Sequence, residues 1–340
     1  MRQTMNMLDQ IAAKLGNTRV DIRDVGMREG LQSHTMVVPT DQKIGLFRGL
    51  VEAGVKEINA VSFVNAQKMP HMADAEALLG GLGSLRDGID ISGVVFSEGG
   101  ARRAIKMREA GLLDTVFLVF SPIASSMAAN GITPDMEALL AQIERTAAAA
   151  AEGGLKVSVF VSESFGSPVE GWVDPELVLR NAQRIWNMQG VKELIISDSS
   201  GQADPVQVLA MFTDLAKILP IDQRITFHVH DSRGAGLANI LAALNSPFQH
   251  FCLDASFGGL GGDYPFVPDA FGNVATEDLV EMLHGMGIET GVDPDKIVKV
   301  SKEYAAISGR PLGSRLSGCS RSIDWKRPHR LVNPIIEAAA

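Results

Sequence analysis

The stretch Ile225-Thr-Phe-His-Val-His-Asp231 is an apolar run that ends in two histidines and a carboxylate. Residues two apart on a β-strand point to the same face, so a strand here would aim both imidazoles at one point. A strand can present two nitrogen ligands to a metal ion in this way. Because the same pattern also arises by chance on surfaces and in packed cores, the position of other polar residues has to decide its meaning.

Eight short apolar or β-branched runs occur along the chain, and each is nearly continuous rather than alternating. Such runs are typical of parallel strands that are buried on both faces. The predicted strands are Arg19–Val25, Glu57–Phe63, Ile91–Phe96, Asp114–Phe120, Leu155–Val161, Glu193–Ser197, Ile225–His230 and His250–Ala255. The stretches between them have helical spacing and include Gln42–Ala53, Gly100–Ala110, Met136–Ala151, Pro175–Asn187, Pro205–Leu219 and Gly236–Leu244.

Strands that alternate with helices predict parallel pairing through right-handed crossovers. Eight such units match a barrel, so the predicted fold class is α/β, a TIM (β/α)8 barrel with an extra C-terminal helix and tail. An open doubly wound sheet is the alternative. That fold would place a glycine fingerprint after the first strand, which the segment Gly26-Met-Arg-Glu-Gly30 does not supply.

The chain has 340 residues, of which 46% are hydrophobic and 21% charged, and its formal net charge is −9. This acidic balance argues against nucleic acid as a partner. Two cysteines imply no disulfide framework and fit a reducing cytoplasm. No apolar run reaches the roughly 18 residues of a membrane span, and the N-terminus lacks a secretory signal. We interpret Met5–Leu15 as a short leading helix.

The C-terminal segment differs from the rest in charge. We expect residues 1–290 to form the barrel and residues 291–340 to form a helix and a basic tail that pack on it. The tail could be solvated, could contact another subunit of a homodimer, or could contact the phosphates of coenzyme A. Its basic residues are Arg310, Arg315, Arg321, Lys326, Arg327 and Arg330.

Polar residues follow several of the predicted strands. A TIM barrel carries its active site at the carboxyl ends of its strands, so residues far apart in the chain should converge there. One carboxylate, two imidazoles and an amide oxygen would suit Mg²⁺ or Mn²⁺, whereas zinc is disfavoured because no cysteine lies among the candidates. The residues are Asp24, Arg28, Glu29, Asn59, Ser62, Asp198, His228, His230, Asp254, Asp263, Asn273 and Glu277.

Each of these residues also has a purely structural interpretation. Glu29 could cap a helix or pair with Arg28. Asp198 and Glu277 could cap the helices that follow them, and Asn273 could be a turn residue.

The chain from Val20 to about Leu312 resembles the 3-hydroxy-3-methylglutaryl-CoA (HMG-CoA) lyase family, within the DRE-TIM metallolyases. The motifs that carry the resemblance are Asp24-Val-Gly-Met-Arg-Glu-Gly-Leu-Gln32, Ser62-Phe-Val64, Met69-Pro-His-Met-Ala-Asp74, His228-Val-His-Asp231, Leu237-Ala-Asn-Ile240 and Gly272-Asn-Val-Ala-Thr-Glu-Asp-Leu279. The resemblance implies a TIM barrel and a divalent metal ion. It implies that the metal ligands are Glu29, His228, His230 and Asn273.

The resemblance also assigns roles beside the metal. It implies that Arg28 stabilises an enolate at the thioester carbonyl. Asp198 and Glu277 match other polar residues of the family site. Asn130 matches a substrate-side asparagine, and Ser62 lies in a motif of the same site.

The chain departs from the family pattern around this site. Glu29 replaces an aspartate, and Asn59 replaces a glutamate that pairs with the arginine. Asp263 stands in place of the catalytic cysteine, in a loop with one extra residue. Ser158 and Phe160 align with an arginine and a tyrosine of the family, and we expect both to line the substrate pocket.

We therefore predict metal-assisted cleavage of a carbon–carbon bond in a 3-hydroxyacyl-CoA other than HMG-CoA. Asp263 is our candidate for the acid that protonates the enolate carbon, with His230, Asp198 and Glu277 as alternatives. The other readings are a synthase that condenses an acyl-CoA with a 2-oxo acid, a CoA-independent 2-oxo acid aldolase, and a barrel without catalysis that binds a ligand.

Overall fold

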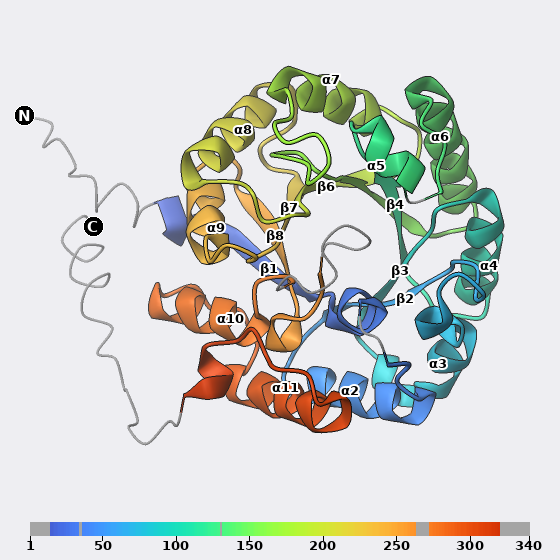
Figure 1. The fold of residues 1–340 in the computed structure, drawn as a ribbon, viewed down its shortest axis with the longest axis vertical. Coiled ribbons are helices and arrows are strands. Elements are labelled where there is room, and N and C mark those ends of the chain that lie inside the picture. The colour runs from blue at the N-terminus through green and yellow to red at the C-terminus, as the bar shows by residue number, and fades with distance from the viewer. Residues whose placement is uncertain (1–13, 34–35, 130, 263–271, 320–340) are drawn as a thin grey trace, which may run out of the picture.

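The polypeptide forms a closed barrel of eight parallel strands with helices in a ring around it (Figure 1). The structure is a computed structural model and describes residues 14–33, 36–129, 131–262 and 272–319. The predicted TIM barrel is confirmed. The strands are β1 (Arg19–Asp24), β2 (Glu57–Ser62), β3 (Asp90–Val94), β4 (Thr115–Phe120), β5 (Lys156–Val161), β6 (Val191–Asp198), β7 (Arg224–Val229) and β8 (His250–Ala255).

Each strand pairs with its neighbours in chain order, and β1 closes the barrel against β8. The strand ends differ from the predicted ones by no more than two residues. One such difference concerns the histidine pair. Strand β7 ends at Val229, so His230 lies just beyond the strand and forms an isolated bridge with Asn273.

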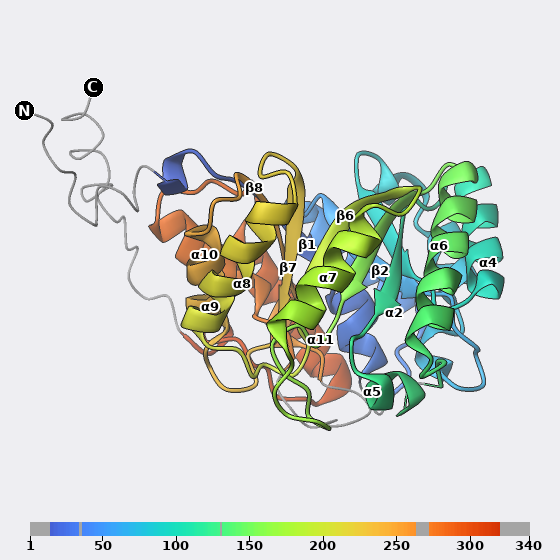
Figure 2. The ribbon, with the colours of Figure 1, turned by 90° about the horizontal axis from the view of Figure 1, so that it is seen from above.

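The helices pack outside the barrel, as the side view shows (Figure 2). Several begin where an aspartate side chain accepts hydrogen bonds from free backbone N–H groups, and Asp204 forms a capping box with Gln207. The helices are α2 (Thr40–Glu52), α3 (Ala75–Gly81), α4 (Glu98–Glu109), α5 (Ala124–Ala129), α6 (Met136–Glu152), α7 (Pro175–Trp186), α8 (Pro205–Ile218), α9 (Gly236–Leu244), α10 (Thr276–Gly285) and α11 (Pro294–Ser308).

Helix α11 lies outside the barrel against α2 and α10 (Figure 1). A helix is thus present beyond residue 290, while the division of the chain at that point stays a prediction. Of the basic tail, Arg310 donates a hydrogen bond to the Gly261 carbonyl oxygen at 3.4 Å. The tail beyond residue 319 and most of the predicted leading helix lie outside the described residues.

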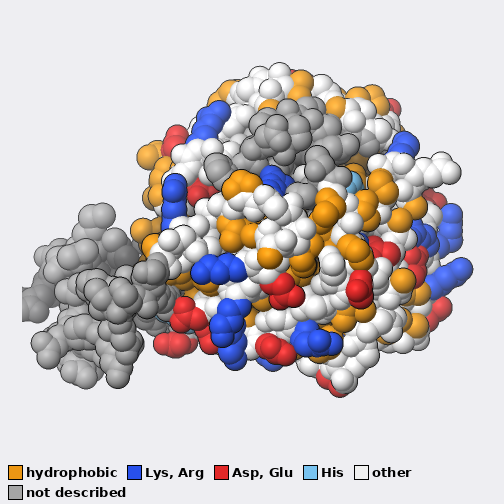
Figure 3. All heavy atoms as spheres, turned by 60° about the horizontal axis from the view of Figure 1, so that its bottom comes forward, with side chains coloured by type: hydrophobic (Ala, Val, Ile, Leu, Met, Phe, Trp, Pro, Cys, Tyr) orange, Lys and Arg blue, Asp and Glu red, His pale blue; other side chains and the backbone are white. Residues whose placement is uncertain are grey.

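The outer surface carries charges of both signs. On the face in Figure 3, acidic and basic side chains are interspersed with apolar ones over the helices. Among the helices that the structure describes, none combines the length and apolar character that crossing a bilayer requires.

The amino-terminal end of the barrel holds a buried ionic cluster. Glu193 on β6 lies 3.4 Å from a guanidinium nitrogen of Arg23 and 2.8 Å from one of Arg224. Ser158 on β5 donates a hydrogen bond to the same carboxylate at 2.7 Å. We predicted that Ser158 binds substrate, but it faces into the barrel at the end opposite the candidate site. An inward-facing position on a barrel strand can belong to any of several layers.

This cluster predicts how stability depends on pH. Burial alone would raise the pKa of Glu193, but Arg23 and Arg224 lower it from 4.5 to about 2. A lowered pKa in the folded state stabilises the protein above pH 4.5, and this stabilisation is lost as the pH falls toward 2. Because one pKa unit corresponds to roughly 1.4 kcal/mol, the loss amounts to about 3 kcal/mol.

Urea unfolding at several pH values measures this loss against the variant Glu193→Gln, whose side chain does not titrate. Between about pH 5 and pH 2, the unfolding free energy of the wild type should fall by about 3 kcal/mol more than that of the variant. Parallel curves for the two proteins would show that Glu193 is not held in its ionised form.

Candidate functional site

Three of the four predicted metal ligands meet at the carboxyl-terminal end of the barrel. The Nε2 atoms of His228 and His230 lie 3.2 Å apart. Oε1 of Glu29 lies 3.4 Å from the first of these nitrogens and 2.8 Å from the second. All three side chains are buried, and their ligand atoms lie within 4.8 Å of one another. This triad offers two imidazole nitrogens and one carboxylate oxygen to a single point.

The fourth predicted ligand, Asn273, lies directly beside the triad. Its Nδ2 donates to Oε1 of Glu29 at 3.1 Å. Its Oδ1 is buried and has no hydrogen-bond partner among the described residues. A half-turn of this amide would direct Oδ1 toward Glu29 and the histidines, where a cation would satisfy it.

A buried carboxylate orients His228. Oδ2 of Asp254, on β8, lies 3.0 Å from Nδ1 of His228, and Oδ1 of Asp254 accepts a hydrogen bond from Nε of Arg23 at 2.7 Å. Placing the Nδ1 proton toward Asp254 leaves Nε2 free as a ligand, which is the usual arrangement around metal-binding histidines. From the sequence, Asp254 was placed at the end of a predicted strand, but it was not assigned a role in orienting His228.

The charges of the triad act on one another. Burial alone would lower the pKa of His228, but the Glu29 charge and the Asp254 hydrogen bond raise it to about 9. Burial alone would raise the pKa of Glu29, but His228 and Arg28 hold it well below its usual range. The site is therefore built to keep a negative charge on Glu29 and to attract positive charge beside it.

The turn that carries Glu29 follows β1 directly. Residues Gly26–Gly30 form one π-helical turn against the loop after β8. A side chain at Gly26 would meet the Phe257 ring at 2.6 Å, and one at Gly30 would meet Leu260 at 2.7 Å. Only glycine fits at these two positions, so the turn can press against that loop and bring Glu29 to the histidines.

Asp24 fastens the base of this turn. Its buried carboxylate accepts hydrogen bonds from the backbone N–H groups of Gly26 and Phe257 and from the Thr276 hydroxyl, at 2.7 to 2.9 Å. Burial raises the pKa of Asp24 to about 7. One side chain thereby ties the end of β1 to the loop after β8 and to the start of α10.

Arg28 lies beside the triad and is held by two partners. Its Nε donates to Oδ1 of Asn59 at 2.7 Å, and its Nη2 lies 3.0 Å from Oε2 of Glu29. Asn59 in turn donates to the Ser92 hydroxyl at 3.1 Å. Asn59 thus orients the guanidinium group and does not itself line the cavity.

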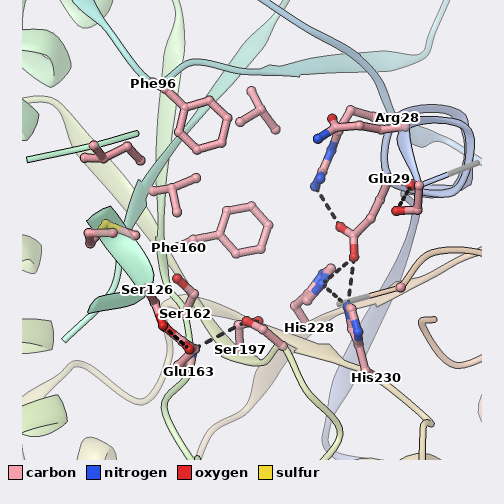
Figure 4. Close-up of a pocket in the computed structure, with 18 residues that line it drawn as sticks. Arg28, Glu29, Phe96, Ser126, Phe160, Ser162, Glu163, Ser197, His228 and His230 are labelled. Carbon is pink, nitrogen blue, oxygen red and sulfur yellow. Dashed lines mark hydrogen bonds and ion pairs between the residues drawn. The ribbon is translucent and has the colours of Figure 1, made fainter. Parts of the chain in front are cut away.

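A cavity opens in front of the triad (Figure 4). Arg28 and the triad line one side of it. An apolar wall includes Phe96 and Phe160, and the Phe160 ring packs edge-on against His228 with centroids 5.2 Å apart. Phe160 therefore lines this cavity, and its contact with substrate stays a prediction. The remaining polar wall consists largely of hydroxyl groups, from Ser126, Ser162, Ser197 and Ser199, with the carboxylate of Glu163.

Sequence reasoning missed Glu163. It follows β5 by two residues, so the rule that identified Asp198 at the end of β6 would have found it. The Glu163 carboxylate is buried and accepts hydrogen bonds from the hydroxyls of Ser121 and Ser126, at 2.6 and 2.7 Å.

Three other predicted site residues are buried outside this cavity lining. Asp198 accepts hydrogen bonds from the backbone N–H groups of Gln202 and Ala203, so it shapes the loop before α8. Glu277 accepts from the Gly258 N–H and from two serine hydroxyls. Ser62 lies within β2, and its hydroxyl has no partner among the described residues. Asp263 and Asn130 lie outside the described residues.

Comparison with known proteins finds a matching family model and several relatives that are named as lyases. A family model described as HMGL-like matches residues 19–303. The cytoplasmic 3-hydroxy-3-methylglutaryl-CoA lyase of Rattus norvegicus is 32% identical over 88% of this chain and 84% of its own. The (R)-citramalyl-CoA lyase of Chloroflexus aurantiacus is 33% identical over 86% of this chain and 92% of its own. The mitochondrial hydroxymethylglutaryl-CoA lyase of Arabidopsis thaliana is 34% identical, and the match spans 61% of its length.

Solved structures agree with these relatives. The HMG-CoA lyase of Bacillus subtilis has a TM-score of 0.81 and 31% identity, and the match covers 88% of this chain and 97% of that one. An HMG-CoA lyase of Acinetobacter baumannii, solved with coenzyme A and 3-methylmalate, has the same TM-score and identity over 94% and 98% of the two chains. Because the family model spans most of the sequence and the barrel matches as well, this chain belongs to the HMGL-like family of lyases.

Proposed function

We propose that this protein is a divalent-metal-dependent lyase that cleaves the C2–C3 bond of a 3-hydroxyacyl-CoA thioester. The observation that carries the proposal is the buried triad of Glu29, His228 and His230, which lies beside Arg28 in a cavity at the carboxyl-terminal end of the barrel. Relatives named as lyases of CoA thioesters support the same class of reaction.

The residues present fit a metal ion. Two imidazole nitrogens and a carboxylate oxygen face one another, and the amide oxygen of Asn273 is buried beside them without a partner. Such a mixed set of oxygen and nitrogen ligands suits Mg²⁺ or Mn²⁺, with Glu29, His228, His230 and Asn273 as the ligands. A bound ion would supply Lewis-acid polarisation of the substrate oxygens.

Arg28 supplies the second source of positive charge. Cleavage of the C2–C3 bond leaves an electron pair that delocalises onto the thioester oxygen as an enolate. Asn59 and Glu29 fix the guanidinium group before substrate arrives. A preorganised donor of this kind stabilises the developing negative charge without reorganising during the reaction.

Proton transfer requires a base at the 3-hydroxyl group and an acid at C2. Asp263 remains our candidate acid. Of the alternatives, His230 lines the cavity, and its Nδ1 has no partner among the described residues. Asp198 and Glu277 accept several hydrogen bonds from their own surroundings, so we assign them positioning roles.

The substrate is proposed to differ from HMG-CoA because residues around the proposed metal site depart from the family pattern. Asn59 is neutral, and Phe160 presents an apolar ring to the cavity. The Acinetobacter baumannii structure contains coenzyme A, which supports a thioester over a free 2-oxo acid. We also propose a cytoplasmic homodimer; the Rattus norvegicus relative is described as cytoplasmic and the Arabidopsis thaliana one as mitochondrial.

Turnover tests the proposed reaction directly. Protein loaded with Mn²⁺ or Mg²⁺ should cleave at least one member of a panel of 3-hydroxyacyl-CoA thioesters, as detected by mass spectrometry of the acyl-CoA product. A chelator should stop the cleavage, and added metal should restore it. Cleavage of 4-hydroxy-2-oxo acids alone would instead make the protein an aldolase, and failure on both panels would favour a barrel without catalysis.

Metal affinity tests the ligand assignment separately. His228→Ala removes one ligand, so Mn²⁺ should bind at least about 100-fold more weakly, given that partners outside the ligand sphere alone contribute 10–100-fold. Electron paramagnetic resonance of free Mn²⁺ measures this affinity. The matched control is His284→Ala, because His284 on α10 contacts Thr290 and lies away from the triad. Equal Mn²⁺ affinity in the two variants would contradict the assignment.

A further inference from the structure

Glu163 has an unusual backbone conformation for its residue type. Its φ is +53°, and it is the only non-glycine residue of the described chain with a positive φ. A glutamate in this region is strained, and such strain persists only where the surroundings impose it, often at functional sites. The residue lies two positions beyond β5, and its side chain lines the cavity.

The Glu163 carboxylate is buried without a cation. Its hydrogen-bond partners are the hydroxyls of Ser121 and Ser126, and no lysine, arginine or histidine of the described chain forms an ion pair with it. A buried carboxylate ordinarily has a partner cation or a metal. This one instead adds negative charge to the cavity wall, on the side away from the triad (Figure 4).

The neighbourhood of Glu163 is rich in hydroxyl groups. Its backbone N–H donates to the Ser199 hydroxyl at 3.3 Å, and the hydroxyls of Ser197 and Ser199 lie 2.9 Å apart. Serine hydroxyls can donate or accept, but the carboxylate can only accept. A ligand group that donates a hydrogen bond therefore fits this wall better than one that only accepts.

Charge decides which substrates this wall admits. The described cavity lining contains one arginine and no lysine, and that arginine, Arg28, is already held by Glu29 and Asn59. On the Glu163 side of the cavity, away from Arg28 and the histidines, the described lining offers a second substrate carboxylate no lysine or arginine to offset the repulsion. Like charges in a buried site are strongly unfavourable.

We propose that Glu163 and its serine neighbours form a specificity subsite for an uncharged, hydrogen-bond-donating group, such as a hydroxyl, on the C3 substituent of the substrate. The same carboxylate excludes substrates that carry a second carboxylate there. This inference rests on the proposed function for the placement of the thioester, and it deepens that function by naming the substrate class.

The test compares two thioesters that differ at one group. One is HMG-CoA, and the other is its analogue in which CH₂OH replaces the distal carboxylate. The wild type should favour the CH₂OH analogue by at least about tenfold, in kcat/KM with Mn²⁺ and in Kd by calorimetry with chelator present. Glu163→Gln removes the charge and keeps the shape, so the preference should fall by about tenfold or reverse.

Two control variants distinguish the loss of the Glu163 charge from a general loss of folding or binding. Glu170→Gln makes the same substitution on the exposed part of the same loop, outside the cavity lining, and should leave the preference unchanged. Ser126→Ala removes one hydroxyl but keeps the Glu163 charge, so it should retain discrimination against the carboxylate even if affinity falls. Thermal melting reports whether each variant is folded.

The outcomes distinguish this subsite from the proposed function. Turnover with the same preference in wild type and Glu163→Gln would overturn the subsite and leave the lyase intact. A Kd preference that depends on Glu163, without turnover of either thioester, would support the subsite; the lyase would then be refuted only by failure on the wider panel of 3-hydroxyacyl-CoA thioesters. Absence of a Kd difference and of turnover would overturn the subsite, and failure on the wider panel would overturn the lyase as well.

Discussion

The hydrogen-bonded chain from Arg23 through Asp254 to His228 connects the interior of the barrel to its candidate active site. Its members belong to β1, β8 and β7, and their contacts are 2.7 and 3.0 Å long. All three side chains are buried. Removing Asp254 would take away the 2.7 Å partner of the buried Arg23, leaving it Glu193 at 3.4 Å, and would also remove the Nδ1 partner of His228. Loss of a partner from a buried charge costs more than loss of a surface pair. The chain therefore fixes the orientation of the first histidine ligand while it joins the strands where the barrel closes.

The loop after β8 helps to hold the other side of the site, where Glu29 and Asn273 lie. Asp24 ties that loop to the end of β1 and to α10, and the glycines of the Gly26–Gly30 turn let the two segments touch. Glu29 and Asn273 come from these two segments. The geometry of the triad thus depends on contacts that involve none of its own ligand atoms, as is common around metal sites.

The sequence predicted the barrel and the triad for the same physical reason. Continuous apolar runs define buried parallel strands, and the ends of such strands converge. The direction of a side chain beyond the strand end depends on the loop, however. Asp198 accepts hydrogen bonds from backbone N–H groups, whereas Glu163, which has a positive φ, lines the cavity. No glycine or other residue pattern marks that conformation. Ser158 was expected in the pocket because it aligns with an arginine of the family, but its own short side chain contacts Glu193 at the opposite end of the barrel.

We propose that Glu29, His228, His230 and Asn273 together hold one divalent ion. Anomalous diffraction from a crystal grown with Mn²⁺ locates the ion most directly. We expect a single strong peak within coordination distance of the Glu29 carboxylate and both Nε2 atoms, with the Asn273 amide oxygen turned toward it. An empty triad, or a manganese peak elsewhere in the barrel, would contradict this account.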